Sequence, residues 1–304
     1  MKSYRFTARP LASGSDSSRP VSLVSHMSSR VLTATDSSEP RRRGHTGECM
    51  IADDTSPADM VNNSWQQGTI ERILPETERV KSFTLRLTQW TAFKPGQHVD
   101  VRVPASDGSH VTGSYSIASA PEWDGVVELT VQLTGNDHVS AYFHEVIRPG
   151  DKLELRGPLG GDFTWTAALG GPLLLIAGGS GIVPLMSMLR HRANADPDIP
   201  ALLLYSTRSL DEVIYRDELD RRALNDPRLI VLYTFTRRPP AGWGSYGKRV
   251  DRKLLADAIQ RLGAPSHVYV CGAPRFVELI ERELATLPVP QVNIRTAGFA
   301  LETT

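Results

Sequence analysis

Apolar residues recur along the chain in two different patterns, and the change falls near residue 166. Before this point, short strand-like runs are separated by turn-forming pairs such as Pro95-Gly96 and Pro149-Gly150. The runs cover residues 82–88, 98–103, 126–133 and 152–156. Short strands at regular spacing predict an antiparallel β-barrel.

After residue 170, continuous apolar strands alternate with stretches of helical periodicity. We expect strands at 173–177, 201–206, 229–234 and 267–271, and helices near 184–193, 212–223, 251–262 and 274–285. This alternation is typical of a doubly wound parallel sheet. The predicted fold class is therefore a β-barrel followed by an α/β domain.

The first 66 residues are rich in serine and lack a sustained period of 2 or 3.6, so we expect a disordered tail at 1–66. Their composition leaves open an organellar transit peptide or an over-extended start. The folded domains are expected at 67–166 and 167–304. Residues 163–189 carry no charge, but glycines and prolines interrupt them, which argues against a membrane helix.

The charge and cysteine content exclude several function classes. The 304 residues include 34 Lys+Arg and 34 Asp+Glu, which argues against a nucleic-acid or membrane surface. Two cysteines cannot ligate an iron–sulfur cluster or a four-cysteine zinc site, and the histidines lack metal-ligand spacing, so no metal is expected. Redox chemistry would require an organic cofactor.

Two small-residue turns follow predicted strands of the second half. The first, Gly178-Gly179-Ser180-Gly181, joins a strand to a helix, where backbone amides and the helix dipole favour a pyrophosphate. Its spacing is not the dinucleotide fingerprint, so a purely structural turn remains open. The second, Cys271-Gly272, ends the last of the four predicted strands at the edge where open α/β sheets bind ligands.

In the first half, the segment Ser114-Tyr115-Ser116-Ile117 places an aromatic ring beside two hydroxyls. Such a segment can stack on a flat ring and hydrogen-bond to its edge, although polar-aromatic strands are usually only half-buried structure. The residue chemistry alone leaves these alternatives open.

The order of these motifs resembles that of the ferredoxin–NADP reductase superfamily, over residues 69–304. The matching motifs are Pro95-Gly96-Gln97, the 115–119 segment, Pro149-Gly150-Asp151, Gly157-Pro158-Leu159-Gly160, the Gly178 turn, 268–272 and a terminal aromatic, Phe299. The resemblance implies a barrel that binds FAD and an α/β domain that binds NADP or NAD.

The resemblance also implies roles for individual residues. Tyr115 would pack on the flavin, with Ser116 near its N5 atom. Backbone of Val131, Gln132 and Leu133 would meet the pyrimidine end, and the helix starting at His138, Val139 and Ser140 would hold a flavin phosphate. Nicotinamide would enter near Gly179, Gly181, Cys271 and Gly272. The catalytic set is then Ser116, Tyr115, Cys271 and Phe299.

Two departures from the family pattern affect these assignments. Gly113 stands where relatives carry an arginine that pairs with the flavin pyrophosphate, so we expect weakened flavin binding unless Arg102, Arg156 or backbone amides compensate. Ala297 and Gly298 replace an acidic and a basic residue near the end of the chain.

The choice between NADP and NAD depends on the end of the second strand of the α/β half. Ser206, Arg208 and Arg216 favour a 2'-phosphate and hence NADP. The alternative is that both arginines pair with nearby carboxylates on an exposed face.

The sequence thus predicts a cytoplasmic, FAD-dependent NAD(P)H oxidoreductase that passes electrons to an external acceptor, either a protein such as a ferredoxin-like carrier or a small molecule. One alternative is a reductase of a small free substrate or of free flavin. Another is a non-catalytic nucleotide-binding module whose flavin site has decayed.

Overall fold

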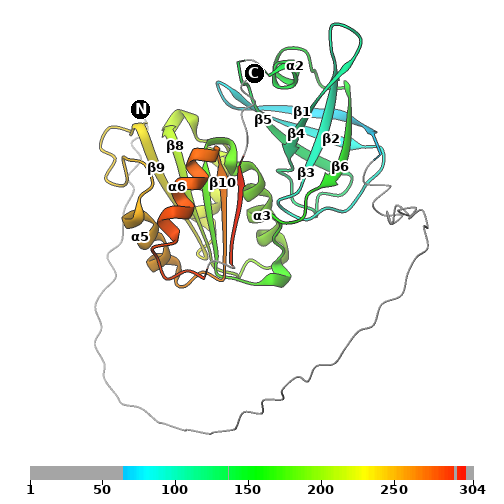
Figure 1. The fold of residues 1–304 in the computed structure, drawn as a ribbon. Coiled ribbons are helices and arrows are strands. Elements are labelled where there is room, and N and C mark those ends of the chain that lie inside the picture. The colour runs from blue at the N-terminus through cyan, green and yellow to red at the C-terminus, as the bar shows by residue number, and fades with distance from the viewer. Residues whose placement is uncertain (1–63, 136, 291–292, 299–304) are drawn as a thin grey trace, which may run out of the picture. The chain divides into compact units, whose positions relative to one another are not determined.

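The computed structural model describes residues 64–135, 137–290 and 293–298. Two sheets organise these residues (Figure 1). The first strand begins at Gln66, at the end of the segment expected to be a tail, while residues 1–63 of that segment lie outside the described residues.

The first sheet is antiparallel, with strand order β4-β3-β6-β1-β2-β5. Its edges approach each other where Ile117, just after β4, bridges to Leu129 of β5. The prediction of an antiparallel first domain is confirmed. Its elements are β1 (Gln66–Thr77), β2 (Val80–Leu87), β3 (His98–Pro104), β4 (His110–Ser116), β5 (Val126–Gln132), α2 (His138–Glu145) and β6 (Lys152–Leu159).

Alternate residues of these strands point into one core, as the two-residue period of a strand requires. The core includes Phe83, Leu85, Val101 and Leu129, all fully buried. Strand β1 was missing from the predicted strands because few of its residues are buried. It pairs with both β2 and β6, so backbone hydrogen bonds hold it in the sheet.

The second sheet is parallel, with order β11-β10-β7-β8-β9, and this confirms the predicted doubly wound domain. Its strands are β7 (Leu173–Gly178), β8 (Ala201–Ser209), β9 (Leu229–Arg238), β10 (His267–Gly272) and β11 (Ile294–Gly298). The helices are α3 (Ile182–Ala195), α4 (Arg216–Asn225), α5 (Arg252–Leu262) and α6 (Pro274–Leu284).

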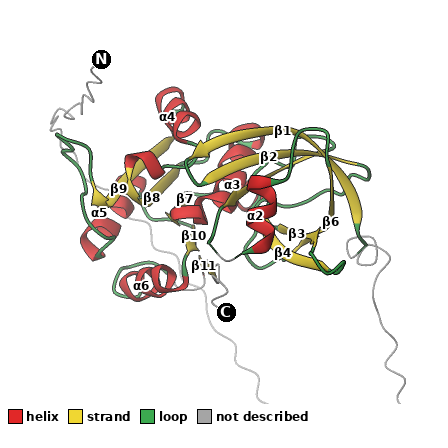
Figure 2. Cartoon of the chain, turned by 90° about the horizontal axis from the view of Figure 1, so that it is seen from above, coloured by secondary structure: helices red, strands yellow, loops and turns green. Residues whose placement is uncertain are grey.

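The helices cover both faces of this sheet (Figure 2). Leu173 and Leu175 of β7 pack in a cluster with residues of α3 and α4, whereas Leu174 and Ile176 pack with residues of α5 and α6. Both faces are thus buried, which explains why the central strands are continuously apolar in sequence.

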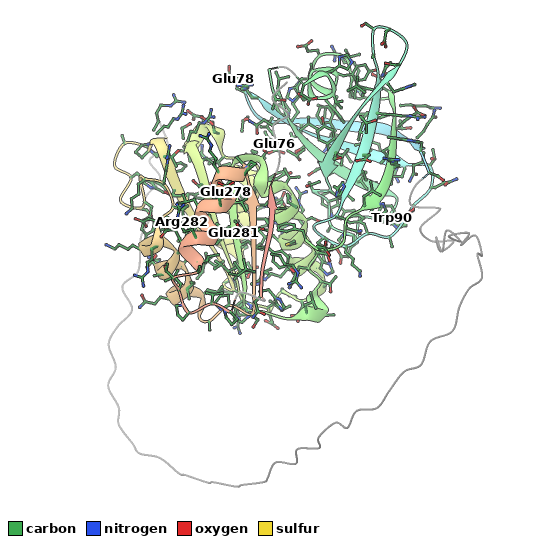
Figure 3. The ribbon with its side chains drawn as sticks, in the orientation of Figure 1. Glu76, Glu78, Trp90, Glu278, Glu281 and Arg282 are labelled. Atoms are coloured by element: carbon green, nitrogen blue, oxygen red, sulfur yellow. The ribbon has the colours of Figure 1, made fainter. Side chains whose placement is uncertain are left out.

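Helix α6 shows how the pattern sets the packing. Val277, Ile280 and Leu284 are buried, while Glu278 and Arg282 lie on its exposed side (Figure 3). This three- and four-residue spacing produces one apolar face. Strand β11, by contrast, was not predicted, since its residues are only partly buried.

The uncharged stretch 163–189 contains the junction of the domains, β7 and the first half of α3. Among the described residues, no helix is both long and apolar enough to cross a membrane. Trp165 in this junction is fully buried and its indole N–H donates to the Gly170 carbonyl at 3.1 Å.

We predict that Trp165→Ala lowers the free energy of unfolding by about 3–5 kcal/mol, because it removes a large side chain and leaves a cavity. Urea titration of the full chain measures the change. The control is Leu224→Ala, whose side chain is 85% exposed and should change stability by less than about 0.5 kcal/mol. Equal losses in the two variants would contradict the structural role of Trp165.

Candidate functional site

The second sheet changes its direction of winding between β7 and β10. Strands β8 and β9 lie on one side of β7, whereas β10 and β11 lie on the other side. Ligands of open α/β sheets bind at the carboxyl ends of strands at such a point. Three glycines at this edge have no room for side chains of their own. A Cβ atom on Gly181 would lie 2.1 Å from the Cys271 carbonyl oxygen, and Cβ atoms on Gly178 and Gly272 would lie 2.8 and 2.7 Å from the ring of Phe276.

Helix α3 begins at this edge, and no side chain caps its first amides. Gly179 adopts a left-handed conformation with φ of +56° and is exposed, and Ser180 beside it is half-buried. The Tyr205 hydroxyl donates to the Gly179 carbonyl at 3.1 Å and fixes the turn. Uncapped amides at the positive end of a helix, with no acidic residue in the first turn, can bind a phosphate.

Cys271 contributes its backbone to this edge, but its side chain lies in the core with no exposed surface. Burial raises the pKa of its thiol well above the ordinary value. The thiol is therefore protonated at neutral pH, and nucleophilic thiolate chemistry does not suit it. The catalytic assignment of Cys271 remains a prediction, and Phe299 lies outside the described residues.

In the first domain, the predicted flavin segment ends β4. The Ser116 side chain is half-buried and makes no hydrogen bond among those found for the described part of the chain, which leaves its hydroxyl available to a ligand. The Ser114 hydroxyl instead donates to Asp100 at 2.6 Å. The Ile117 side chain points into the barrel core, and its N–H donates to the Gln97 carbonyl. Neither its side chain nor its N–H is therefore available to a ligand.

The Tyr115 ring folds back along β4 over Gly113, where a Cβ atom would lie 3.0 Å from the ring. It also packs edge-on against Phe143 of α2, with centroids 5.3 Å apart. Burial and the neighbouring Asp137 raise the pKa of the Tyr115 hydroxyl, which stays protonated and hydrogen-bonds to that carboxylate. An arginine at position 113 would compete with this ring for space.

The amino end of α2, predicted to hold a flavin phosphate, is capped by the side chain of Asp137. The Asp137 carboxylate accepts hydrogen bonds from the Val139 and Ser140 amides at 3.2 and 3.0 Å. The Ser140 side chain is buried and its hydroxyl bonds to Asp137 and Thr134. The His138 ring contacts the Pro104 carbonyl at 3.0 Å. A phosphate would have to displace the Asp137 carboxylate from these amides.

Arg102 and Arg156, the two arginines expected to compensate for the absent arginine at position 113, are both engaged in other contacts. Arg102 makes two hydrogen bonds to Glu154, at 2.8 and 2.9 Å. Arg156 bonds to Asp100 at 3.0 Å. Both guanidinium groups also stack on Trp65, 4.5 and 5.0 Å from its ring centroid. These contacts fasten the start of the described chain to the outside of the barrel.

The backbone at the end of β5 is also partly engaged. The His144 ring contacts the Val131 carbonyl at 3.0 Å, and the Arg79 guanidinium donates to the Leu133 carbonyl at 2.8 Å. Gln132 between them is exposed. Their predicted contacts with the flavin therefore remain predictions.

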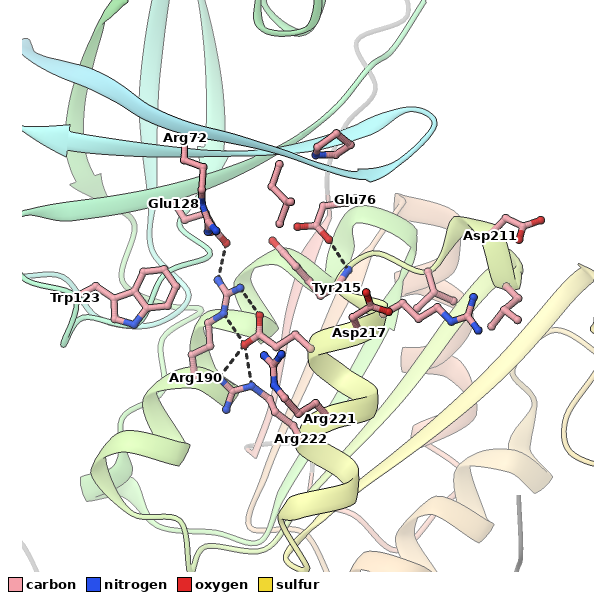
Figure 4. Close-up of a pocket in the computed structure, with 16 residues that line it drawn as sticks. Arg72, Glu76, Trp123, Glu128, Arg190, Asp211, Tyr215, Asp217, Arg221 and Arg222 are labelled. Carbon is pink, nitrogen blue, oxygen red and sulfur yellow. Dashed lines mark hydrogen bonds and ion pairs between the residues drawn. The ribbon is translucent and has the colours of Figure 1, made fainter. Parts of the chain in front are cut away.

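The residues expected to select NADP are not brought together. Ser206 is buried, whereas Arg208 beside it is exposed. Arg216 lines a cavity of about 630 Å³ between the β1–β2 hairpin and α4, and neither Ser206 nor Arg208 lines it (Figure 4). Five arginines and five carboxylates line this cavity, so it has no net charge to attract a phosphate. Arg190 also lines this cavity, and the sequence analysis missed its importance.

Family comparisons divide the chain in the same way as its two sheets. Residues 69–165 match the family model of the oxidoreductase FAD-binding domain, and residues 175–282 match that of the oxidoreductase NAD-binding domain.

Individual relatives agree with these matches. The chain is 34% identical over 212 residues to ferredoxin–NADP reductase B of Sorangium cellulosum, covering 68% of this chain and 85% of that protein. It is 27% identical to the reductase component of a naphthalene 1,2-dioxygenase system of Pseudomonas putida, covering 77% of this chain and 69% of the relative. The fold is shared with the FAD/NAD-binding domain of a Vibrio cholerae nitric oxide dioxygenase, at a TM-score of 0.68 and 21% identity over 77% of this chain and 98% of that structure.

We predict that Gly181→Ala weakens NADP⁺ binding by at least about tenfold, because the added methyl group would force α3 away from β10 and distort the amides of the turn. Titration calorimetry on the full chain measures the affinity. Gly244→Ala is the matched control, since a Cβ atom there meets nothing within 4 Å. Unchanged NADP⁺ affinity in Gly181→Ala would contradict the assignment of this turn.

Proposed function

Because the chain belongs to the ferredoxin–NADP reductase superfamily of FAD- and NAD(P)-dependent oxidoreductases, we propose that it oxidises NAD(P)H and passes the electrons to an external acceptor. The observation that carries this proposal is the uncapped, glycine-lined start of α3 at the switch point of the sheet, in a chain that also carries the FAD-binding barrel. Bound FAD would accept the hydride of NAD(P)H, which is thereby oxidised to NAD(P)⁺, and the reduced flavin can release its two electrons one at a time.

The residues of the barrel fit the ring end of a flavin better than its phosphate end. The Ser116 hydroxyl, which has no hydrogen-bond partner among the described residues, and the half-buried Tyr115 ring suit a flat heteroaromatic group with polar edges. At the phosphate end, Gly113 supplies no cation and Asp137 supplies a negative charge. In our proposal Ser116 and Tyr115 hold the ring, the amides of the Gly178 turn hold the nicotinamide nucleotide, and flavin binding is weaker than in relatives with the arginine.

The external acceptor is proposed to be a redox protein, because the similar naphthalene dioxygenase component is named as a ferredoxin reductase. The second candidate is reduction of free flavin or another small molecule, which the self-capped start of α2 favours, since weak flavin binding allows exchange. The relatives are oxidoreductases, which leaves the non-catalytic alternative without support. A cytoplasmic location and a preference for NADP remain parts of the proposal.

We predict that the full chain, reconstituted with FAD, loses its visible flavin absorbance when NADPH is added without oxygen. Repeating the titration with NADH gives the ratio of NADPH to NADH efficiencies, which we expect to exceed one because the Arg208 side chain is exposed near the end of β8. Turnover with free flavin alone would favour the small-substrate candidate over a protein acceptor. A flavin spectrum that neither cofactor bleaches would overturn the proposed function.

We predict that Asp137→Asn tightens FAD binding by about three- to tenfold, because asparagine still caps α2 but no longer repels a phosphate. Fluorescence titration measures the dissociation constants of FAD and of riboflavin, which has no phosphate. Riboflavin affinity should stay unchanged.

Asp251→Asn is the matched control, because Asp251 is also an N-cap and accepts a hydrogen bond from the Leu254 amide of α5. An equal increase in riboflavin affinity, or the same increase in FAD affinity in the control variant, would show that the effect does not arise from phosphate binding at α2.

A further inference from the structure

Arg190 of α3 lies between the two domains and is only 4% exposed. One side of its guanidinium donates to the Ala118 carbonyl at 3.0 Å and to the Glu128 carboxylate at 2.6 Å, both in the first domain. The other side donates to the two carboxylate oxygens of Glu218 in α4, at 3.1 and 2.6 Å (Figure 4). One side chain therefore connects the two domains.

Aromatic rings hold this guanidinium in place from the sides. The ring centroids of Trp123 and Tyr215 lie 5.0 and 5.1 Å from its central carbon. Tyr215 adopts a left-handed backbone conformation, and its N–H donates to the Glu76 carboxylate of β1 at 3.0 Å. The Tyr215 hydroxyl also donates to Thr130 of β5. Tyr215, which stacks on Arg190 from the second domain, is thus itself hydrogen-bonded to the first domain.

The charge of Arg190 is permanent. Burial alone would lower the pKa of its guanidinium, but the hydrogen bonds to Glu218 and the charge of Glu128 raise it above the ordinary value. With two carboxylates and a carbonyl as acceptors, the side chain has one orientation that satisfies its buried donors.

Ser187, one turn earlier on the same face of α3, makes a second contact across the domains. It is fully buried, and its hydroxyl donates to the Ser119 carbonyl at 2.6 Å. Ala118 and Ser119 follow Ser116 by two and three residues, and the Ala118 N–H pairs with the Glu128 carbonyl. The backbone directly after the proposed flavin strand is therefore held by two side chains of α3.

The other end of α3 is the glycine turn that is proposed to bind the nicotinamide nucleotide. From Ile182 to Arg190 a helix rises about 12 Å, and a packed helix transmits displacement as a rigid unit. The same element thus contacts both proposed cofactor positions.

We propose that Arg190, assisted by Ser187, is a positioning residue that sets the distance between the nicotinamide turn and the flavin strand and so controls the rate of hydride transfer. This inference rests on the proposed function. Hydride transfer is sensitive to small displacements, because misplacing the reacting groups by about 1 Å can cost 10²-fold in rate.

The test uses Arg190→Lys in the full chain, because lysine keeps the charge beside Glu128 but cannot form the fork to Glu218. We expect NADPH to bleach the bound flavin about 10- to 100-fold more slowly, while the affinities for NADP⁺ and FAD and the rate of reduction by dithionite stay unchanged. Dithionite needs no nicotinamide geometry and therefore isolates the alignment step.

A readout without cofactors accompanies these rates. Hydrogen exchange at the amides of Ile117 and Ala118 should become faster in Arg190→Lys, because the carbonyl of Ala118 loses its partner in α3. Should Arg190→Lys fail to fold, Arg190→Met combined with Glu128→Gln removes the two most buried charges of the cluster, while Glu218 keeps its ion pair with Arg222. This double variant is expected to give the same slowing.

Arg192→Lys is the matched control. Arg192 lies on the same helix at 1% exposure, but it bonds to Asp226 and to the carbonyls of Ile199 and Pro197, all within the second domain. It should lower thermal stability without changing the bleaching rate or the exchange at 117–118. A wild-type bleaching rate in Arg190→Lys, or equal slowing in Arg192→Lys, would overturn the inference. Failure of the wild-type protein to bleach would instead overturn the proposed function.

Discussion

A buried guanidinium is stable only when its donors find acceptors, and Arg190 meets this requirement with groups from both domains. The cost of removing the charges of Arg190, Glu128 and Glu218 from water is offset by short, well-aligned hydrogen bonds, so the net contribution to stability is small. What such a cluster supplies is geometry, since few other arrangements of the domains satisfy all three groups. Apolar contacts between the domains, such as Val80 and Ala118 in the core cluster of the second domain, carry no comparable directional requirement.

The two helix amino ends illustrate how one physical effect is used in different ways. At α3 no side chain caps the amides beside the glycine turn, although the Ile182 N–H bonds to carbonyls of that turn, whereas at α2 the Asp137 carboxylate occupies the amides. Amides at the positive end of a helix dipole need acceptors, and the chain supplies a side-chain acceptor at α2 but none at α3. An external anion meets this need only where the chain itself does not, so the proposed phosphate site lies at α3 and not at α2.

The sequence predicted the architecture because the features that determine it are local. Apolar runs, turn pairs and helical periodicity are sufficient to place most strands, and the exceptions, β1, β4 and β11, bury too few side chains to show a pattern. The Gly178 turn was also recognisable, since its residue type and its place after an apolar strand are both visible in sequence. The preference of aspartate for helix amino ends could have predicted the cap at Asp137.

Arg190 could not be predicted in the same way. Its acceptors lie 62 and 28 residues away in sequence, on β5 and α4. Folding of the second domain brings Glu218 to Arg190, and only the docking of the domains adds Glu128. The only local signal was a charged residue at the end of an apolar stretch. The separation of Arg216 from Ser206 has a different cause, because residues close in sequence can face different spaces once a strand gives way to a helix.

The stacking of Trp65 on Arg102 and Arg156 has a consequence for where the folded body of this protein starts. These contacts precede β1 and cover two ion pairs on the outside of the barrel, so water would reach Arg102 and Arg156 more freely without the indole. A shortened chain that starts at residue 67, the boundary suggested by hydrophobic patterning, would cut away this cover together with the first residue of β1. A shortened chain that starts at Met60 would retain both Trp65 and Gln66, the first residue of β1.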